Sequence, residues 1–224
     1  MKINFQNING IFVAGTDTNV GKTIVSAAFI CALRRRKNVC YWKPIQTGIE
    51  ADDDTKTVRE LANCSDAEIF DKGFRLEKPL SPHLSARLAN VEITVEKILD
   101  FLPNEPDERF WIIEGAGGAL VPLNETELLI DLIKVLDLPV VVAARSGLGT
   151  INHTLLTVEA LRNRGLEIFG VIMNGEPNDE NRQAIERFGQ VKVLAKMAKF
   201  KLLTNKNLEI WAKGNLPKTV FIND

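Results

Sequence analysis

Short apolar runs recur along the chain, each bounded by polar, glycine or proline residues. Within each run, apolar residues follow one another without the alternation of apolar and polar positions that a half-buried strand shows. Such runs are typical of strands that are buried on both faces of a sheet. We therefore predict buried strands at residues 11–14, 39–42, 110–113, 140–144 and 168–173.

The segments between these runs carry apolar residues at helical spacing. In residues 23–36, Ile24, Ala28 and Cys31 fall on one face, and the basic end of the segment suits a helix dipole. Similar patterns predict helices at 91–101, 125–136, 152–164 and 180–188. The alternation predicts an α/β fold, a mostly parallel sheet covered by helices on both faces, with ligands beyond the carboxyl ends of its strands.

Composition and charge narrow the class of protein only slightly. The 224 residues, 45% hydrophobic and 25% charged, are typical of one globular α/β domain over residues 1–224. The 28 basic and 29 acidic residues give a net charge of -1. This balance does not favour a nucleic-acid-binding protein or a polybasic membrane protein.

The start of the chain and its cysteines point to an ordinary cytoplasmic protein. Residues 1–10 are polar and lack the apolar segment of a signal peptide, and no apolar run approaches the ~20 residues of a membrane span. Cys31, Cys40 and Cys64 form no Cys-x-x-Cys pair. We therefore expect free thiols rather than metal ligands or disulfides.

The segment GTDTNVGKT at residues 15–23 follows the first predicted strand and opens the first predicted helix. This is the context of a phosphate-binding P-loop, in which backbone N–H groups face a polyphosphate. Lys22 would reach the phosphate oxygens, and the Thr23 hydroxyl would hold Mg²⁺. The usual motif would have its first glycine at Thr16, whereas this chain has Gly15. A tight turn without a ligand is the alternative.

Two acidic segments offer further oxygen ligands. Glu114 follows the predicted strand 110–113 and precedes a glycine-rich turn, so it is either a metal ligand or a helix-capping acid. Asp52, Asp53 and Asp54 precede a helical stretch, where one of them either caps the helix or supplies a second carboxylate for Mg²⁺. Spacing alone does not choose among the three aspartates.

Lys43 follows the predicted strand 39–42 at the edge where ligands bind, and Pro44 ends the strand there. A lysine in this place is able to stabilise anionic oxygens. The alternative is an exposed lysine at the end of a strand, which is the more common case. The residue by itself leaves both interpretations open.

Taken together, five segments resemble the dethiobiotin synthetase family of biotin biosynthesis, in the same order over most of the chain. They are GTDTNVGKT (15–23), KPIQTG (43–48), SPH (81–83), EGAGG (114–118) and GLGTINHTLL (147–156). One such segment would be a weak signal, but five in register are specific. The resemblance implies a fold like that of P-loop nucleoside triphosphate hydrolases. It also implies that Lys43 helps to activate substrate and to stabilise the transferring phosphate.

The resemblance implies roles for the residues at matching positions. Lys22 and Lys43 would be catalytic, and Thr23, Asp54 and Glu114 would hold Mg²⁺. The substrate would contact Thr47, Gly118, Gly149, Thr150, Ile151 and Asn152, the last four from the second subunit of a homodimer. The nucleotide would contact Thr18, Asn19, Val20, Gly21, Lys22, Thr23, Asp54, Glu114, Gly115, Ala116, Gly117, Asn174, Gly175, Ala198, Lys199 and Phe200.

The implied reaction uses ATP, Mg²⁺, CO2 or bicarbonate, and 7,8-diaminononanoate (7,8-diaminopelargonate). The diamine and CO2 form a carbamate, ATP phosphorylates it to a carbamic-phosphoric anhydride, and ring closure gives dethiobiotin with release of ADP and phosphate. Phosphoryl transfer of this kind needs in-line positioning and charge neutralisation more than a protein nucleophile. Mg²⁺, Lys22 and Lys43 would supply the positive charge around the γ-phosphate.

Some positions depart from the family pattern, mostly where the base would bind. Asn19 stands where the family often has Glu, and Gly175 follows Asn174 in place of an acid. Residues 197–200 read MAKF where the family commonly has Ile-Pro before an apolar residue. We therefore expect the phosphate side of the site to match the family better than the base side.

Two other classes of protein share this scaffold. A regulatory or partitioning ATPase would carry a second lysine five residues before Lys22, where this chain has Asp17. It would also not need the small-molecule site that Lys43 and Thr47 imply. A small-molecule kinase would leave phosphate on its substrate, whereas the implied reaction releases it. We expect a ligase rather than either of these.

Overall fold

The computed structural model describes residues 8–216, which form a seven-stranded parallel sheet and a separate two-stranded one. The larger sheet has the order β4-β2-β6-β1-β7-β8-β9, and every neighbouring pair is parallel. Its strands are β1 (Ile8–Gly15), β2 (Val39–Trp42), β4 (Ile69–Phe70), β6 (Asp107–Gly118), β7 (Val140–Arg145), β8 (Ile168–Asn174) and β9 (Val193–Met197). The smaller sheet pairs β3 (Ile45–Thr47) with β5 (Phe74–Leu76).

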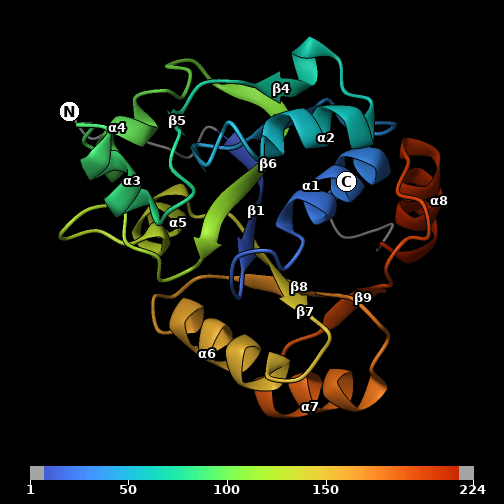
Figure 1. Ribbon diagram of the computed structural model, residues 1–224. Helices are drawn as coiled ribbons and strands as arrows, with labels where there is room; N and C mark the ends of the chain where they lie inside the picture. Colours follow the sequence, from blue (N-terminus) through green and yellow to red (C-terminus); the bar gives the residue numbers. More distant parts are fainter. Residues whose placement is uncertain (1–7, 217–224) are drawn as a thin grey trace.

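Helices cover both faces of the larger sheet (Figure 1). One face packs against α1 (Lys22–Leu33), α2 (Asp54–Ala62) and α8 (Asn205–Asn215). The other packs against α3 (Pro82–Leu88), α4 (Val95–Leu99), α5 (Leu129–Leu136), α6 (Thr150–Arg162) and α7 (Asp179–Gly189). A short 3-10 helix, η1 (Asp66–Glu68), precedes β4. Within residues 8–216, no helix combines the length and the apolar character that crossing a membrane requires.

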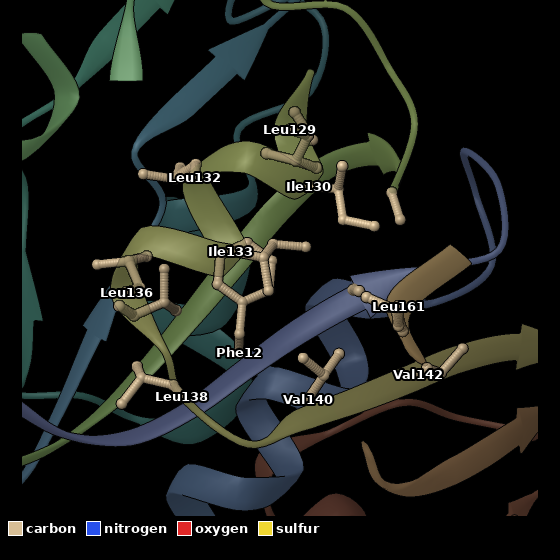
Figure 2. Packing of buried hydrophobic residues seen from close by; sticks show 14 of the residues in the cluster. Phe12, Leu129, Ile130, Leu132, Ile133, Leu136, Leu138, Val140, Val142 and Leu161 are labelled. Carbon is tan, nitrogen blue, oxygen red and sulfur yellow. The ribbon is translucent and has the colours of Figure 1, made fainter. Parts of the chain in front are cut away.

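The central strand β1 shows why the apolar runs do not alternate. Phe12 and Ala14 belong to the core on the α5 side, whereas Ile11 and Val13 belong to the core on the α1 side, and all four are fully buried. Figure 2 shows the Phe12 ring directed from β1 toward Ile133 of α5. Successive side chains point to opposite faces of a strand, so a strand covered on both faces needs apolar residues at every position.

All five predicted strands are present, but β6 is longer than its predicted counterpart. The prediction ended that strand at Ile113, whereas β6 continues to Gly118 because β1 pairs with it as far as Gly15. Glu114 therefore lies inside β6 and is fully buried. The alternative interpretation of Glu114 as a helix-capping acid is wrong.

The five predicted helices are also present. The one predicted at 23–36 ends early, at Leu33, and two others are shortened more strongly. The helix predicted at 91–101 is confined to α4, whose first turn is capped by the Thr94 hydroxyl. The helix predicted at 125–136 begins at Leu129, because the Asn124 side chain accepts the N–H groups of Thr126 and Glu127 in a turn. The short strands β3, β4, β5 and β9 and the helices α3 and α8 were not predicted.

The parallel strands place the chemistry at one edge of the sheet. The P-loop follows β1, Lys43 follows β2, and Asn174 ends β8, so segments distant in the sequence meet at the carboxyl ends of the strands (Figure 1). The expected single domain over residues 1–224 stays a prediction, since residues 1–7 and 217–224 lie outside the part that the structure describes.

Candidate active site

A cleft of about 860 Å³ opens at the carboxyl edge of the sheet. Its wall is formed by the P-loop, the segment after β2, the start of α2, residues 79–82 and the end of β6. Predicted site residues on this wall are Thr18, Asn19, Gly21, Lys22, Thr23, Lys43, Thr47, Asp54, Glu114, Ala116 and Gly117. The structure thus brings together the predicted metal and catalytic residues and most of the predicted phosphate-binding residues.

The P-loop enters α1 through a glycine in the left-handed region. Gly21 is the N-cap residue with φ 91°, and no side chain caps the first turn of α1, which leaves its N–H groups suited to an anion. Gly15 has the role expected of the first glycine of the motif, because a Cβ there would lie 2.9 Å from Lys22 Nζ. Lys22 Nζ donates to the Asp17 carbonyl oxygen over 3.0 Å. The shifted glycine therefore still makes room for the P-loop lysine.

Thr23, Asp54 and Glu114 meet although they come from α1, α2 and β6. The Thr23 hydroxyl lies 2.7 Å from Asp54 Oδ1 and 3.1 Å from Glu114 Oε1. Hydroxyl and carboxylate oxygens are hard ligands that fit Mg²⁺, which usually takes one or two carboxylates together with phosphates and water. Across the described chain, no three His, Cys, Asp or Glu side chains gather as a metal site. A Mg²⁺ ion bound here would therefore depend on nucleotide phosphates for further ligands.

The three consecutive aspartates have different surroundings. Asp53 is the N-cap of α2, and its side chain accepts the Lys56 N–H over 3.0 Å. Asp54, the next residue, turns its carboxylate to Thr23, whereas Asp52 is exposed. Helix capping and the candidate metal site therefore use two different members of the run.

Lys43 is buried, with 3% of its side chain exposed, so the alternative of an exposed lysine is wrong. Its ammonium group lies 2.6 Å from Asp54 Oδ2 and 2.8 Å from Glu114 Oε1. It also donates to the Gly115 carbonyl oxygen over 3.1 Å. Lys43 thus joins both carboxylates of the candidate metal site.

The two lysines of the cleft differ in their electrostatics. Burial alone would lower the pKa of Lys43, but the charges of Glu114 and Asp54 outweigh burial and raise that pKa above its ordinary value. Burial, and then repulsion from Lys43, lower the pKa of Lys22 to about 8. Burial would raise the pKa of Asp54, yet the charge of Lys43 holds it below its usual range. An anionic ligand would relieve the unpaired positive charge of Lys22.

Three polar residues that support the site were not predicted. Gln46 is buried and holds the loop before α2, since its amide donates to the Asp52 carbonyl oxygen over 2.8 Å and accepts the Asp54 N–H over 3.3 Å. The Tyr41 hydroxyl and the Ser26 hydroxyl both lie against Glu114 Oε2. The sequence did offer one signal, since Tyr41 lies in a predicted buried strand just before Lys43. It did not show that Glu114 accepts the tyrosine hydroxyl.

The predicted substrate residues lie in separate places. Thr47 lines the main cleft, whereas Gly118 lines an adjoining hollow of about 410 Å³. Thr150 is buried and its hydroxyl donates to the Arg145 carbonyl oxygen, while Asn152 is exposed. None of residues 149–152 lines the main cleft of this chain.

The predicted base-binding residues do not form a comparable polar cluster. Asn174 Nδ2 donates to the Val20 carbonyl oxygen over 2.6 Å, so this side chain supports the P-loop. The Gly175 N–H donates to the Met197 carbonyl oxygen, which joins β8 to β9. Ala198 and Lys199 are exposed, and Phe200 packs against the core on the α1 side.

Comparison with known proteins places this chain among P-loop enzymes. A family model described as "AAA domain" matches residues 9–207. The ATP-dependent dethiobiotin synthetase BioD of Paramagnetospirillum magneticum is 48% identical over 190 residues, covering 85% of this chain and 88% of that protein. The protein of the same name from Agrobacterium fabrum is 43% identical over 192 residues, covering 86% and 87%. The chain also matches 42% of the length of the biotin biosynthesis bifunctional protein BioCD of Bordetella avium, at 47% identity over 91% of this chain.

Solved structures share the fold at low sequence identity. A ParA family ATPase from Chlorobium tepidum TLS has a TM-score of 0.57 at 12% identity, covering 92% of this chain and 98% of that one. The cell division ATPase MinD of Pyrococcus furiosus has a TM-score of 0.55 at 13% identity, covering 92% and 89%. These structures confirm the predicted P-loop α/β fold.

Proposed function

The chain belongs to the dethiobiotin synthetase family, and on that premise we propose that it converts 7,8-diaminononanoate, CO2 and ATP into dethiobiotin, ADP and phosphate. The observation that carries the proposal is the contact of buried Lys43 with both Asp54 and Glu114, beside Thr23 and the P-loop. Such a centre places positive charge where a phosphoryl group would transfer. The neighbouring Thr47 would contact the diamine.

The proposed reaction has three steps. One amine of the substrate attacks CO2 and loses a proton to give a carbamate. A carbamate oxygen then attacks the γ-phosphorus of ATP, the bond to the leaving ADP oxygen breaks, and a carbamic-phosphoric anhydride forms. The second amine attacks the carbonyl carbon, phosphate leaves and a proton is lost, which closes the cyclic urea of dethiobiotin.

The residues of the cleft divide this work between them. The first turn of α1 and Lys22 would bind the triphosphate, and bound phosphates would favour the charged form of Lys22. Lys43 would stabilise the oxygens that gain negative charge as the carbamate attacks. Held by Asp54 and Glu114, its ammonium is positioned before the reaction begins.

Thr23, Asp54 and Glu114 are the residues that would hold Mg²⁺ together with phosphate oxygens. The ion would supply positive charge to the β- and γ-phosphates. The convergence of three oxygen donors supports this assignment, and the neighbouring lysine pair would share the same anionic ligand. We therefore include Mg²⁺ in the proposed reaction.

We further propose a cytoplasmic homodimer in which residues 149–152 contact the substrate bound by the partner subunit. Helix α6 begins at Gly149 with φ 87° and no side-chain cap, as an anion-binding helix start would. Four other helices begin with a capping side chain, namely Asp53, Thr94, Asn178 and Thr204, whereas α1 and α3 begin without one, as α6 does. Around α6 the exposed leucines Leu120, Leu148 and Leu156, at 51%, 101% and 56%, suit contact with a second copy of the chain.

Mixing two inactive variants tests the shared site. If Lys43 and Asn152 of different subunits serve one site, a hybrid of Lys43→Ala and Asn152→Ala protomers contains one site free of both changes. Full exchange would then restore about a quarter of wild-type activity, since half the dimers are hybrids with one intact site in two. An active monomer in sedimentation, or no recovery after exchange, would contradict the shared site.

Mass analysis of the product tests the reaction itself. The protein is incubated with the diamine, ATP, Mg²⁺ and ¹³C-bicarbonate, and we expect a product with the mass of diamine plus labelled CO2 minus water. Phosphate retained on the diamine would indicate a kinase. ATP hydrolysis that leaves the diamine unchanged would indicate a regulatory ATPase. Asp17 already argues against that class, because such an ATPase would carry a lysine at this position.

A further inference from the structure

Glu114 lies between two sets of hydrogen-bond donors. Its Oε1 atom faces the cleft, where Lys43 Nζ and the Thr23 hydroxyl lie at 2.8 and 3.1 Å. Its Oε2 atom faces the core on the α1 side, where the Tyr41 hydroxyl and the Ser26 hydroxyl lie at 2.9 and 3.0 Å. Glu114, Tyr41 and Ser26 are each fully buried, so solvent does not satisfy either oxygen.

The two donors on the core side are not equivalent. A hydroxyl carries one proton, and Ser26 has two acceptors in reach, Glu114 Oε2 and the Lys22 carbonyl oxygen, both at 3.0 Å. Among the described residues, the Tyr41 hydroxyl is placed against one acceptor, Glu114 Oε2. Tyr41 is therefore the donor that is committed to this carboxylate.

We propose that Tyr41 is a positioning residue for the metal and phosphate site. Its hydroxyl fixes the far oxygen of Glu114, and this directs the near oxygen toward Thr23 and Lys43. The rest of the tyrosine ring is packed in the core, so the hydroxyl has little freedom to follow another acceptor. This inference rests on the proposed function, because it takes Glu114 as a ligand of Mg²⁺.

The chemistry of metal sites gives the size of the expected effect. Residues that orient a ligand without touching the metal typically change metal affinity by about 10–100-fold when they are removed. Tyr41→Phe removes one hydroxyl and keeps the ring, whereas Ser26→Ala removes a donor that is shared with the backbone of α1. We therefore expect Tyr41→Phe to weaken metal binding more than Ser26→Ala does.

Binding of Mn²⁺ in the presence of a non-hydrolysable ATP analogue tests the proposal without turnover. We expect the affinity for Mn²⁺ to fall about tenfold in Tyr41→Phe and less than about threefold in Ser26→Ala. The affinity for the analogue without metal should stay at the wild-type value in both variants. Unchanged Mn²⁺ binding in Tyr41→Phe, or an equal loss in Ser26→Ala, would overturn the proposal.

The chain contains one tyrosine, which permits a second measurement on the intact hydroxyl. Protein labelled with 3-fluorotyrosine has one fluorine resonance, and we expect Glu114→Gln to shift it because the acceptor of the Tyr41 proton changes. An unshifted resonance would overturn the proposal even if Tyr41→Phe fails to fold. Absence of metal-dependent analogue binding in the wild-type protein would instead overturn the proposed function, so the two failures are distinguishable.

Discussion

The strands on the two sides of β1 end at the same edge of the sheet, but they carry different chemistry. On the side of β2 and β6, Lys43 and Glu114 are 3% and 0% exposed and lie 2.8 Å apart. On the side of β8 and β9, Ala198 and Lys199 are exposed, and the Asn174 amide nitrogen donates to the Val20 carbonyl oxygen of the P-loop. The Oδ1 atom of Asn174 is buried without a hydrogen-bond partner among the described residues. The proposed phosphate side is thus a buried charged network, whereas two of the residues on the proposed base side are exposed.

This difference is consistent with what each side is proposed to bind. Burying a charge costs free energy unless opposite charges and hydrogen bonds surround it, so a network like that of Lys43, Asp54 and Glu114 suits a site where charge develops during reaction. A nucleobase is neutral and is selected by a few hydrogen bonds. We therefore expect substitutions on the phosphate side to alter catalysis strongly and substitutions on the base side to alter it little.

Lys43→Ala should give the largest effect. In the proposed reaction Lys43 would lie where the transferring phosphoryl group gains charge, so we expect kcat to fall about 100-fold or more, equivalent to about 3 kcal/mol of transition-state stabilisation. Lys199→Ala is the matched control, a lysine removed from the other side of β1. Near-normal turnover of a folded Lys43→Ala protein would remove this lysine from the mechanism and erase the contrast between the two sides.

Asp54→Asn should act on the metal requirement. We expect the Mg²⁺ concentration at half-maximal activity to rise about 30-fold, because an amide oxygen is a weaker ligand than a carboxylate. Asp52→Asn makes the same chemical change at an exposed neighbour, and it should leave the Mg²⁺ concentration at half-maximal activity unchanged. Activity measured against Mg²⁺ concentration distinguishes them, and a stronger response at Asp52 would mean that this loop is assigned to the wrong aspartate.

Lys22→Met should act on stability, and we expect it to stabilise the ligand-free protein. The pKa of Lys22 is about 8 in the folded state, lowered by burial and by Lys43, against 10.5 ordinarily. Below pH 8 the lysine is charged in both states, and the folded state bears the full cost of the buried charge. We expect the free energy of unfolding of the variant at pH 7 to exceed that of the wild-type protein by about 1–2 kcal/mol. This figure allows for the lost hydrogen bond to the Asp17 carbonyl oxygen.

The pH dependence of the free energy of unfolding provides a control for this prediction. As pH rises from 8 to 10.5, folded wild-type protein releases the Lys22 proton while unfolded protein keeps it, so the contribution of Lys22 to wild-type stability should rise over that window. Lys22→Met lacks this contribution, and its advantage should shrink toward pH 10.5. Denaturant unfolding at several pH values measures both curves, and a constant difference between them would contradict the assigned cause.

The two sides of the site also differ in how far the sequence predicts them. The P-loop is a continuous segment between a strand and a helix, so its local pattern predicts its position and its role. The choice of Asp54 depends on Asp53 capping α2, and the contact of Tyr41 with Glu114 joins residues 73 positions apart. Neither is encoded by local spacing. On the proposed base side, the strand β9 was not predicted at all. The sequence therefore did not predict the position of the residues that follow this strand, Ala198, Lys199 and Phe200.

The smallest effects should come from the base side itself. Lys199 is exposed and is not among the described residues that line the cleft, so we expect Lys199→Ala to change kcat/KM for ATP less than about threefold.

The choice of nucleotide should also have a small effect. We expect CTP or GTP to support turnover within about 100-fold of ATP, which is less than about 3 kcal/mol of discrimination. Phosphates and Mg²⁺ are common to all these nucleotides, and they would bind the side of the cleft where the charged residues are buried. Values of kcat/KM for the four triphosphates measure the preference. A preference for ATP above a thousandfold would mean that backbone groups near Asn174 select the base without the missing side chains, and the two sides of the sheet would then be equally specialised.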